Sequence, residues 1–260
     1  AKEYVFATGS VSRPETGSTG DGFGWLRDLG HTVAKPTPTI VPLAVKEKWL
    51  KNLMGVTLED TVVTFFVDDT KQLRVRGDIL CTHFGLSGPT ILNVAHKVAA
   101  LLPTGTVTAR LDVFPTQDLG ALEKTLIALF DANKNKELKN ILKEFIPAGT
   151  SKGISLLFAE KIDLSKKVHS ITKEERKYLV QTLKALPVTI TGLMGFDRAV
   201  IADGGIALAE VDFKTMRSKK ISNLFVTGDL LHINRPSGGF SLQLCWSTGF
   251  VAGSSAGVQE

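Results

Sequence analysis

The sequence predicts an α/β fold of the mixed α+β kind. In this fold an antiparallel barrel-like sheet is interrupted along the chain by a block of helices. β-Branched or alternating runs at residues 61–67, 71–75 and 106–114 are typical of strands. Residues 117–185 instead repeat apolar side chains at helical spacing, and strand-like runs return after Pro187. With 260 residues, 43% of them hydrophobic, the chain can bury one large or two modest cores without disulfide bonds.

The strands of the sheet are expected to be joined by a hairpin and a helix. Asp68, Asp69 and Thr70 provide turn chemistry between the first two runs. Ser87-Gly88-Pro89 predicts a helix with Pro in its first turn and an apolar stripe formed by Ile91, Leu92, Ala95, Val98 and Ala99. After Pro187 we expect strands at residues 188–191, 199–202 and 206–209, with a turn at 203–205.

The N-terminal residues 4–7 predict a buried strand, which needs strand partners on both sides. Because the chain begins almost directly with this strand and its first residue is not Met, we expect a missing N-terminal segment. Asp21 is expected to cap a short helix that Gly30 ends. Three prolines within residues 35–42 predict an extended crossover between domains.

The helical block and the C-terminal region each carry a clear signal. Thr172 followed by Glu175 forms a capping box, which predicts the start of the last helix of the block. Residues 224–226 predict a strand, followed by a long loop and a helix from about residue 240 to 257.

Several classes of protein and site are disfavoured. No apolar run reaches the ~18 to 20 residues of a bilayer span and no leader opens the chain, so we expect no membrane partner. Cys81 and Cys245 form no C-x-x-C pair, which fits a cytoplasmic protein. The five His residues show no ligand spacing, so we predict no metal site.

The net charge of +5 is concentrated in the helical block. Residues 116–186 hold 13 Lys and Arg against 9 Asp and Glu, a difference of +4. These lysines alternate with acids and the segment lacks Trp, whereas nucleic-acid platforms use clusters of one sign and exposed aromatic rings. We therefore interpret the block as a solvated helical surface and expect no nucleic-acid partner.

The motif richest in chemistry is a strand ending in Gly228-Asp229, followed by Gly238-Gly239 at the start of the last helix. Gly228 lets a ligand approach the backbone, and the Asp229 carboxylate can accept hydrogen bonds from sugar-type hydroxyls. The free N–H groups and dipole of the helix start suit an anion, such as the negative charge of a reduced flavin ring. An ordinary strand-loop-helix of an α/β fold explains the same residues equally well.

Two further motifs are less specific. Ala7-Thr8-Gly9-Ser10 and the Gly-rich residues 17–22 can bind polar ligand atoms, although such a loop is often only a turn. His83, beside a glycine turn, is a candidate proton donor, and a structural hydrogen-bonding role is the alternative. Gly85-x-Ser87-x-Pro89 lacks the final glycine of a nucleophile elbow, which argues against a hydrolase that uses Ser87 and His83.

Five motifs, in the same order, resemble one family: A-T-G-S, G-S-T-G-D-G, T-H-F-G-L-S-G-P, D-F-K-T-M-R-S-K, and T-G-D-L-L with S-G-G-F-S-L-Q-L-C-W-S-T-G. This family comprises FAD-binding oxidoreductases similar to bile-acid 4,6-reductases and aminoacetone oxidases. The resemblance spans nearly the whole chain. It departs at residues 231–235, where the family has an acidic and glycine-containing loop, and at Ser10, where the family has Gly.

The resemblance implies a specific organisation. Residues 1–35 and 218–260 would be the remnant of a glutathione-reductase-like FAD domain, residues 36–115 and 187–217 a β-barrel-like domain, and residues 116–186 a helical insert. The family's opening G-x-G-x-x-G turn, which holds the FAD pyrophosphate, is absent from this sequence. We therefore expect this chain alone to bind FAD weakly or not at all.

The resemblance also implies a function and site residues. The parent protein would be a FAD-dependent enzyme that passes hydride between the flavin and a small organic substrate, with NAD(P)H as the other redox partner. The cofactor-binding residues would be Thr8, Gly9, Ser10, Gly228, Asp229, Gly238, Gly239, Phe240, Ser241 and Leu242. The competing hypothesis is a non-catalytic module whose barrel and basic helices contact nucleic acid or another protein.

Overall fold

The computed structural model describes residues 1–257 and divides the chain into two compact units. Unit 1 comprises Ala1–Pro42, Leu92–His96 and Met194–Glu260, and unit 2 comprises Leu43–Ile91 and Lys97–Leu193. The predicted mixed α/β fold with a barrel is confirmed. The finer division into three domains stays a prediction.

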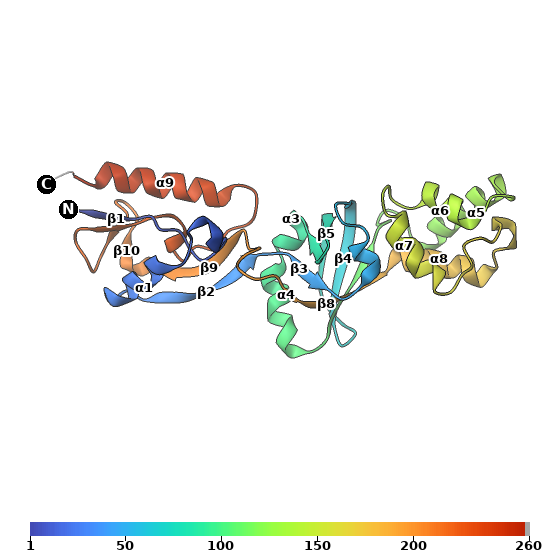
Figure 1. Cartoon of the computed structure of the whole chain (residues 1–260), viewed down its shortest axis with the longest axis horizontal. Coiled ribbons are helices and arrows are strands. Elements are labelled where there is room, and N and C mark those ends of the chain that lie inside the picture. Colours follow the sequence, from blue (N-terminus) through green and yellow to red (C-terminus); the bar gives the residue numbers. More distant parts are fainter. Residues whose placement is uncertain (258–260) are drawn as a thin grey trace. The chain divides into compact units, whose positions relative to one another are not determined.

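Unit 2 contains a closed barrel with the strand order β3-β6-β5-β4-β7-β8. Figure 1 labels β3, β4, β5 and β8 of this barrel. The strands are β3 (Leu43–Val45), β4 (Thr57–Val67), β5 (Thr70–Cys81), β6 (Gly85–Ser87), β7 (Val107–Asp112) and β8 (Leu186–Leu193). Neighbouring strands pair antiparallel throughout. Asp68 and Asp69 have positive φ angles of 44° and 64°, as a tight hairpin turn between β4 and β5 requires. The buried side chains of Val63, Phe65, Ile79 and Leu111 contribute to the core.

The helix expected after Ser87 is broken into two pieces, α3 (Pro89–Leu92) and α4 (Ala95–Leu101). A further short helix, α2 (Lys48–Lys51), packs against α7 of the helical block.

The helical block consists of α5 (Leu119–Ala132), α6 (Leu138–Phe145), α7 (Ser151–Ala159) and α8 (Lys173–Lys184), which gather together in Figure 1. The predicted capping box is confirmed. Thr172 Oγ1 accepts a hydrogen bond from Glu175 N at 3.1 Å, and Glu175 Oε2 accepts one from Thr172 N at 2.9 Å. The helices bury one apolar face each, as their periodicity predicts.

Unit 1 contains a sheet with the order β1-β12-β11-β10. Its strands are β1 (Tyr4–Phe6), β10 (Val211–Asp212), β11 (Arg217–Ser218) and β12 (Leu224–Val226), and β1 lies parallel to β12. Within the described residues β1 has a strand partner on one side only. Tyr4 and Val5 are consequently 48% and 46% exposed, so the expected burial of this strand is not found here.

A second sheet of unit 1 pairs β2 (Val33–Ile40) with β9 (Ile201–Ile206) antiparallel. The predicted turn at residues 203–205 is therefore wrong, because Asp203-Gly204-Gly205 lies inside β9. The glycine at 204 serves close packing: a Cβ there would lie 2.7 Å from Pro36 Cα. Of the three prolines of the expected crossover, Pro36 and Pro38 lie in β2, whose pairing shifts register twice, and Pro42 follows that strand.

Two helices pack on these sheets, α1 (Asp21–Asp28) and α9 (Phe240–Ser255). The N-cap of α1 is Gly20, so the prediction that Asp21 caps this helix is wrong by one residue. The core of unit 1 joins Phe23 and Leu26 of α1, Phe225 and neighbouring residues of β12, and Ala252 of α9. Within residues 1–257, no helix combines the length and apolar character needed to cross a bilayer.

Candidate functional site

The carboxyl ends of β1 and β12 bring two of the sequence motifs together. Phe6 pairs with Val226 in parallel register, and Thr227 N donates a hydrogen bond to Phe6 O at 3.1 Å. The chain then continues into Thr8-Gly9-Ser10 after β1 and into a short 3-10 helix, η5 (Gly228–Leu230), after β12. Ligands of open α/β sheets bind beside such carboxyl ends.

The Gly-rich residues before α1 pack directly against the first of these ends. A Cβ on Gly22 would lie 2.1 Å from Thr8 Oγ1 and 2.9 Å from Leu230 Cδ2, so any larger residue there would force these side chains to move. A Cβ on Gly9 would lie 3.2 Å from Ser18 Oγ. The two Gly-rich motifs therefore form one surface, although they are separated in sequence.

Two hydroxyl groups in this region are buried without a partner. Ser10 and Ser12 are only 3% and 9% exposed. Their Oγ atoms are inaccessible to solvent and make no hydrogen bond within the described residues. An unsatisfied buried hydroxyl costs roughly 1 to 3 kcal/mol. Such groups are normally satisfied by an ordered water molecule or by a polar ligand atom.

The diglycine bend before α9 borders an open cavity of about 340 Å³. Gly238 and Gly239 have φ angles of 110° and 87°, which glycine tolerates, and a Cβ on Gly239 would meet no atom within 4 Å. Asp229, Ser241, Leu242 and Cys245 line the same cavity together with Gly238 and Gly239. A cavity of this size lies at the lower end of the range for small-ligand sites, about 300–1,000 Å³.

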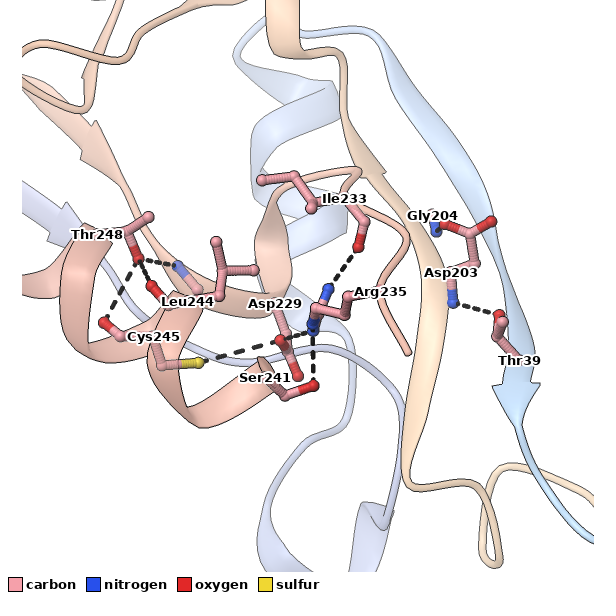
Figure 2. A network of polar contacts seen from close by, with 11 residues as sticks. Thr39, Asp203, Gly204, Asp229, Ile233, Arg235, Ser241, Leu244, Cys245 and Thr248 are labelled. Carbon is pink, nitrogen blue, oxygen red and sulfur yellow. Dashed lines mark hydrogen bonds and ion pairs between the residues drawn. The ribbon is translucent and has the colours of Figure 1, made fainter. Parts of the chain in front are cut away.

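Arg235 ties the wall of this cavity together (Figure 2). Its side chain is 6% exposed and contacts the Asp229 carboxylate through Nη2. Its Nε donates to Ser241 Oγ at 2.9 Å, and its Nη1 donates to Ile233 O at 2.5 Å. Because all three guanidinium nitrogens are engaged, the loop between η5 and α9 is held by one side chain.

This network changes the expected role of Asp229. The carboxylate was expected to accept ligand hydroxyls, but one of its oxygens is paired with Arg235. Burial raises the pKa of Asp229, and Arg235 opposes that shift. Burial, followed by the nearby Asp229 charge, also raises the pKa of the Cys245 thiol, whose Sγ lies 4.0 Å from Asp229 Oδ1.

The helix that begins at the cavity exposes large apolar side chains. Phe240, Leu242, Trp246 and Phe250 of α9 are 55%, 58%, 65% and 76% exposed. A helix that is apolar on all sides is normally covered on all sides. The exposed face of α9 is therefore a surface suited to further contacts.

The structure brings most of the predicted cofactor residues into this part of unit 1. Gly238, Gly239, Ser241, Leu242 and Asp229 line the cavity. The remaining predicted residues, Thr8, Gly9, Ser10, Gly228 and Phe240, lie at the ends of β1 and β12 and at the start of α9.

The candidate proton donor His83 lies in unit 2, in the turn between β5 and β6. Its side chain is exposed and packs edge-on against Phe84. His83 does not line the cavity at the diglycine bend, and its predicted role as a proton donor stays a prediction.

Sequence analysis missed Arg235, Cys245 and Val200 as parts of the cavity and its wall. Arg235 falls in the segment 231–235 that departs from the family pattern, and this departure was the available signal. Val200 immediately precedes β9, far from the motif in sequence, and no local pattern indicates it.

A separate network in unit 1 has the geometry of a hydrolase triad. His31 Nε2 lies 2.9 Å from Ser218 Oγ, and His31 Nδ1 lies 2.8 Å from Glu210 Oε2. Ser218 and His31 are each 4% exposed, however, and Ser218 Oγ already accepts hydrogen bonds from two backbone N–H groups. A buried, fully engaged hydroxyl cannot meet a substrate carbonyl, so we assign this network to stability.

Metal ligation has no support in the described part of the chain. Among residues 1–257, no three His, Cys, Asp or Glu side chains come together in a group that could hold a metal ion.

Comparison with known proteins assigns the chain to a family. A family model described as "HI0933-like protein barrel and H2TH domain" matches residues 37–201, more than half of the chain. The chain is 26% identical to the 3-dehydro-bile acid delta(4,6)-reductase of Clostridium scindens, covering 98% of this chain and 62% of that protein. It is similar to ribosomal RNA dihydrouridine synthases of Haemophilus influenzae (26% identical; 99% of this chain, 61% of that protein) and Escherichia coli (25%; 96% and 59%). The chain thus spans about three fifths of the length of these relatives. By the family match, it belongs to the HI0933-like proteins with a barrel and H2TH domain.

Proposed function

We propose that this chain is part of a FAD-dependent oxidoreductase that adds hydrogen to an unsaturated small organic substrate. The single observation that carries the proposal is the open cavity of about 340 Å³ at the diglycine bend, where the N-terminal end of α9 begins. FAD, when bound, would supply the hydride chemistry, and the protein would supply binding and orientation.

The residues present fit such a group in three respects. The N–H groups at the start of α9 are suited to the negative charge that a reduced flavin ring carries. Apolar Leu242 and Val200 border the cavity and suit the faces of an aromatic ring. The unpartnered hydroxyls of Ser10 and Ser12 suit polar atoms of a large cofactor.

Each residue has a distinct role in this proposal. Gly238 and Gly239 keep the bend free of side chains, so that a flat ring can approach the backbone. Ser241 Oγ accepts a hydrogen bond from Arg235 Nε. The hydroxyl hydrogen of Ser241 therefore points away from Arg235 and can be donated to a cofactor oxygen. Thr8, Gly9, Ser10 and Gly228 would contact the remainder of the cofactor.

The relatives support the reaction class. One relative is named a reductase, and the other two are named for synthesis of dihydrouridine, a hydrogenated form of uridine. Both names denote a substrate that gains hydrogen. We propose NAD(P)H as the electron donor. We also propose the cytoplasm as the location, because both described cysteines are unpaired thiols, as is usual in a reducing compartment.

A uridine in RNA is a second candidate substrate. The names of two relatives favour it, and the helical block carries four more basic than acidic residues. Against it, at least three of the lysines of the block are paired with acids: Lys136 with Glu144, Lys139 with Glu137, and Lys166 with Glu175.

The test is to purify the protein from its complete reading frame and measure bound flavin and NAD(P)H oxidation. We expect FAD to co-purify, and NAD(P)H to be consumed faster with a 3-oxo-Δ4,6 steroid than with unmodified ribosomal RNA. A protein that neither contains nor binds FAD would overturn the proposal. A response to RNA alone would favour the second candidate.

A further inference from the structure

A second cavity, of about 200 Å³, lies beside the proposed flavin cavity in unit 1. Ile40 and Pro236 line both cavities, so the two are adjacent. Asn93, His96 and Asn234 provide most of the polar lining of the second cavity. None of the residues that line it is Asp or Glu.

Hydrogen bonding fixes the orientation of the Asn93 amide. Asn93 Oδ1 accepts hydrogen bonds from Ser237 N and from Ser237 Oγ, both at 2.8 Å. Because a backbone N–H can only donate, the accepting atom must be the amide oxygen. The NH2 group of Asn93 is consequently a donor, and no partner for it is found among the described residues.

The other polar groups of this cavity divide into available and engaged donors. His96 follows Asn93 by three residues, is exposed, and forms no hydrogen bond or ion pair within residues 1–257. Thr39 Oγ1 donates to Thr37 O and accepts from Asp203 N, and the Arg235 nitrogens are occupied. The cavity thus presents two donors for an oxygen acceptor, the Asn93 NH2 group and the His96 imidazole, which always carries at least one N–H. The exposed Asn234 amide can donate or accept.

We propose that this second cavity is the substrate subsite, in which Asn93 Nδ2 and His96 donate hydrogen bonds to the carbonyl oxygen of an α,β-unsaturated carbonyl compound. The inference rests on the proposed function, because it takes the neighbouring cavity as the flavin site. Hydrogen bonds to that oxygen withdraw electron density from the conjugated double bond and so prepare it to accept hydride. Positioned donors of this kind act where charge develops during a reaction.

The experiment uses cyclohex-2-enone as the probe and follows the histidine ring resonances of the protein by NMR. The His96 signal, assigned through His96→Gln, should shift on titration with millimolar enone. Asn93→Asp keeps an oxygen for Ser237 but removes the NH2 donor, so the enone should bind at least about tenfold more weakly. His96→Gln, a change at an exposed position, should weaken enone binding by about threefold or more. In this variant, binding is followed through the NMR resonances of the enone itself. His169→Gln, in the helical block, should leave the affinity unchanged.

The inference is overturned if the enone causes no shift of the His96 signal, or if it binds wild type and Asn93→Asp with equal affinity. Acetate that binds more tightly than the enone, and is lost in Asn93→Asp, would also overturn it by indicating a carboxylate site. FAD binding is measured in the same variants, all made in the protein from the complete reading frame, and should stay within about twofold of wild type. Failure of the wild type to bind FAD overturns the proposed function separately from the outcome with the enone.

Discussion

The buried guanidinium of Arg235 contacts the carboxylate of Asp229 at the point where the chain turns from β12 toward α9 (Figure 2). The two side chains are 6% and 22% exposed, so water screens the pair only in part. Arg235 also reaches Ser241 and Ile233. Loss of this ion pair should therefore both destabilise the loop between η5 and α9 and change the shape of the cavity that the loop borders.

Removal of one partner should be costly. Arg235→Met leaves the Asp229 carboxylate buried and unpaired, and we expect the free energy of unfolding to fall by about 2 to 4 kcal/mol, slightly below the usual cost for a fully buried pair. Urea unfolding measures this change. The double variant Arg235→Met with Asp229→Asn should recover part of the loss; strictly additive losses would show that the two side chains do not interact.

Two glycines of α1 should respond in opposite directions to alanine. Gly22→Ala places a methyl group 2.1 Å from Thr8 Oγ1 and should lower the free energy of unfolding by about 1 to 3 kcal/mol. Gly24→Ala, where a Cβ meets no atom within 4 Å, should raise it by up to about 1 kcal/mol through helix propensity. Urea midpoints compare the two, and Thr8→Ala should partly rescue Gly22→Ala. Equal effects at both positions would argue against the packing of Thr8 on α1.

The two thiols should react at different rates. Burial raises the pKa of Cys81 to about 12, whereas Cys245 lies in the cavity wall with a smaller rise of its pKa. Iodoacetamide should therefore modify Cys245 first, at a rate that increases with pH, as peptide mass spectrometry can follow. In the protein from the complete reading frame, added FAD should slow this reaction. Modification of Cys81 before Cys245 would contradict the structure.

Glu210 should contribute to stability in acid. The Lys220 ammonium, followed by His31 and Thr32, holds the pKa of Glu210 at about 2, below the usual value of about 4.3. A carboxyl group whose pKa is lowered in the folded state stabilises the fold above its unfolded pKa, and this contribution is lost as the pH falls toward the folded pKa.

The stability difference between wild type and Glu210→Gln should accordingly be largest above about pH 4.3 and shrink toward pH 2. Chemical unfolding at a series of pH values measures this difference. A difference that stays constant over that range would show that Glu210 is not held by these partners.

Local signals predicted the barrel hairpin, the capping box and the helix at α9, because each depends on neighbouring residues such as Thr172 and Glu175. The turn expected at residues 203–205 failed because glycines can serve close strand packing as well as turns, and the partner Pro36 is distant in sequence. The diglycine bend was predicted to be part of a cofactor site; the structure places a cavity beside it, and the cofactor role stays a prediction. The Asp229–Arg235 pair could not be foreseen, because ion pairing depends on how a loop folds back and not on a spacing rule.

The central claim is that the cavity at the start of α9 holds the flavin of FAD. The most direct test is an FAD titration of the protein from the complete reading frame, in wild type and two variants. Leu242→Trp fills the cavity from an exposed position. Leu156→Trp is a matched change at an exposed residue of α7. The account predicts that Leu242→Trp weakens FAD binding by at least about tenfold while Leu156→Trp binds like wild type. Equal FAD affinity in all three proteins would contradict it.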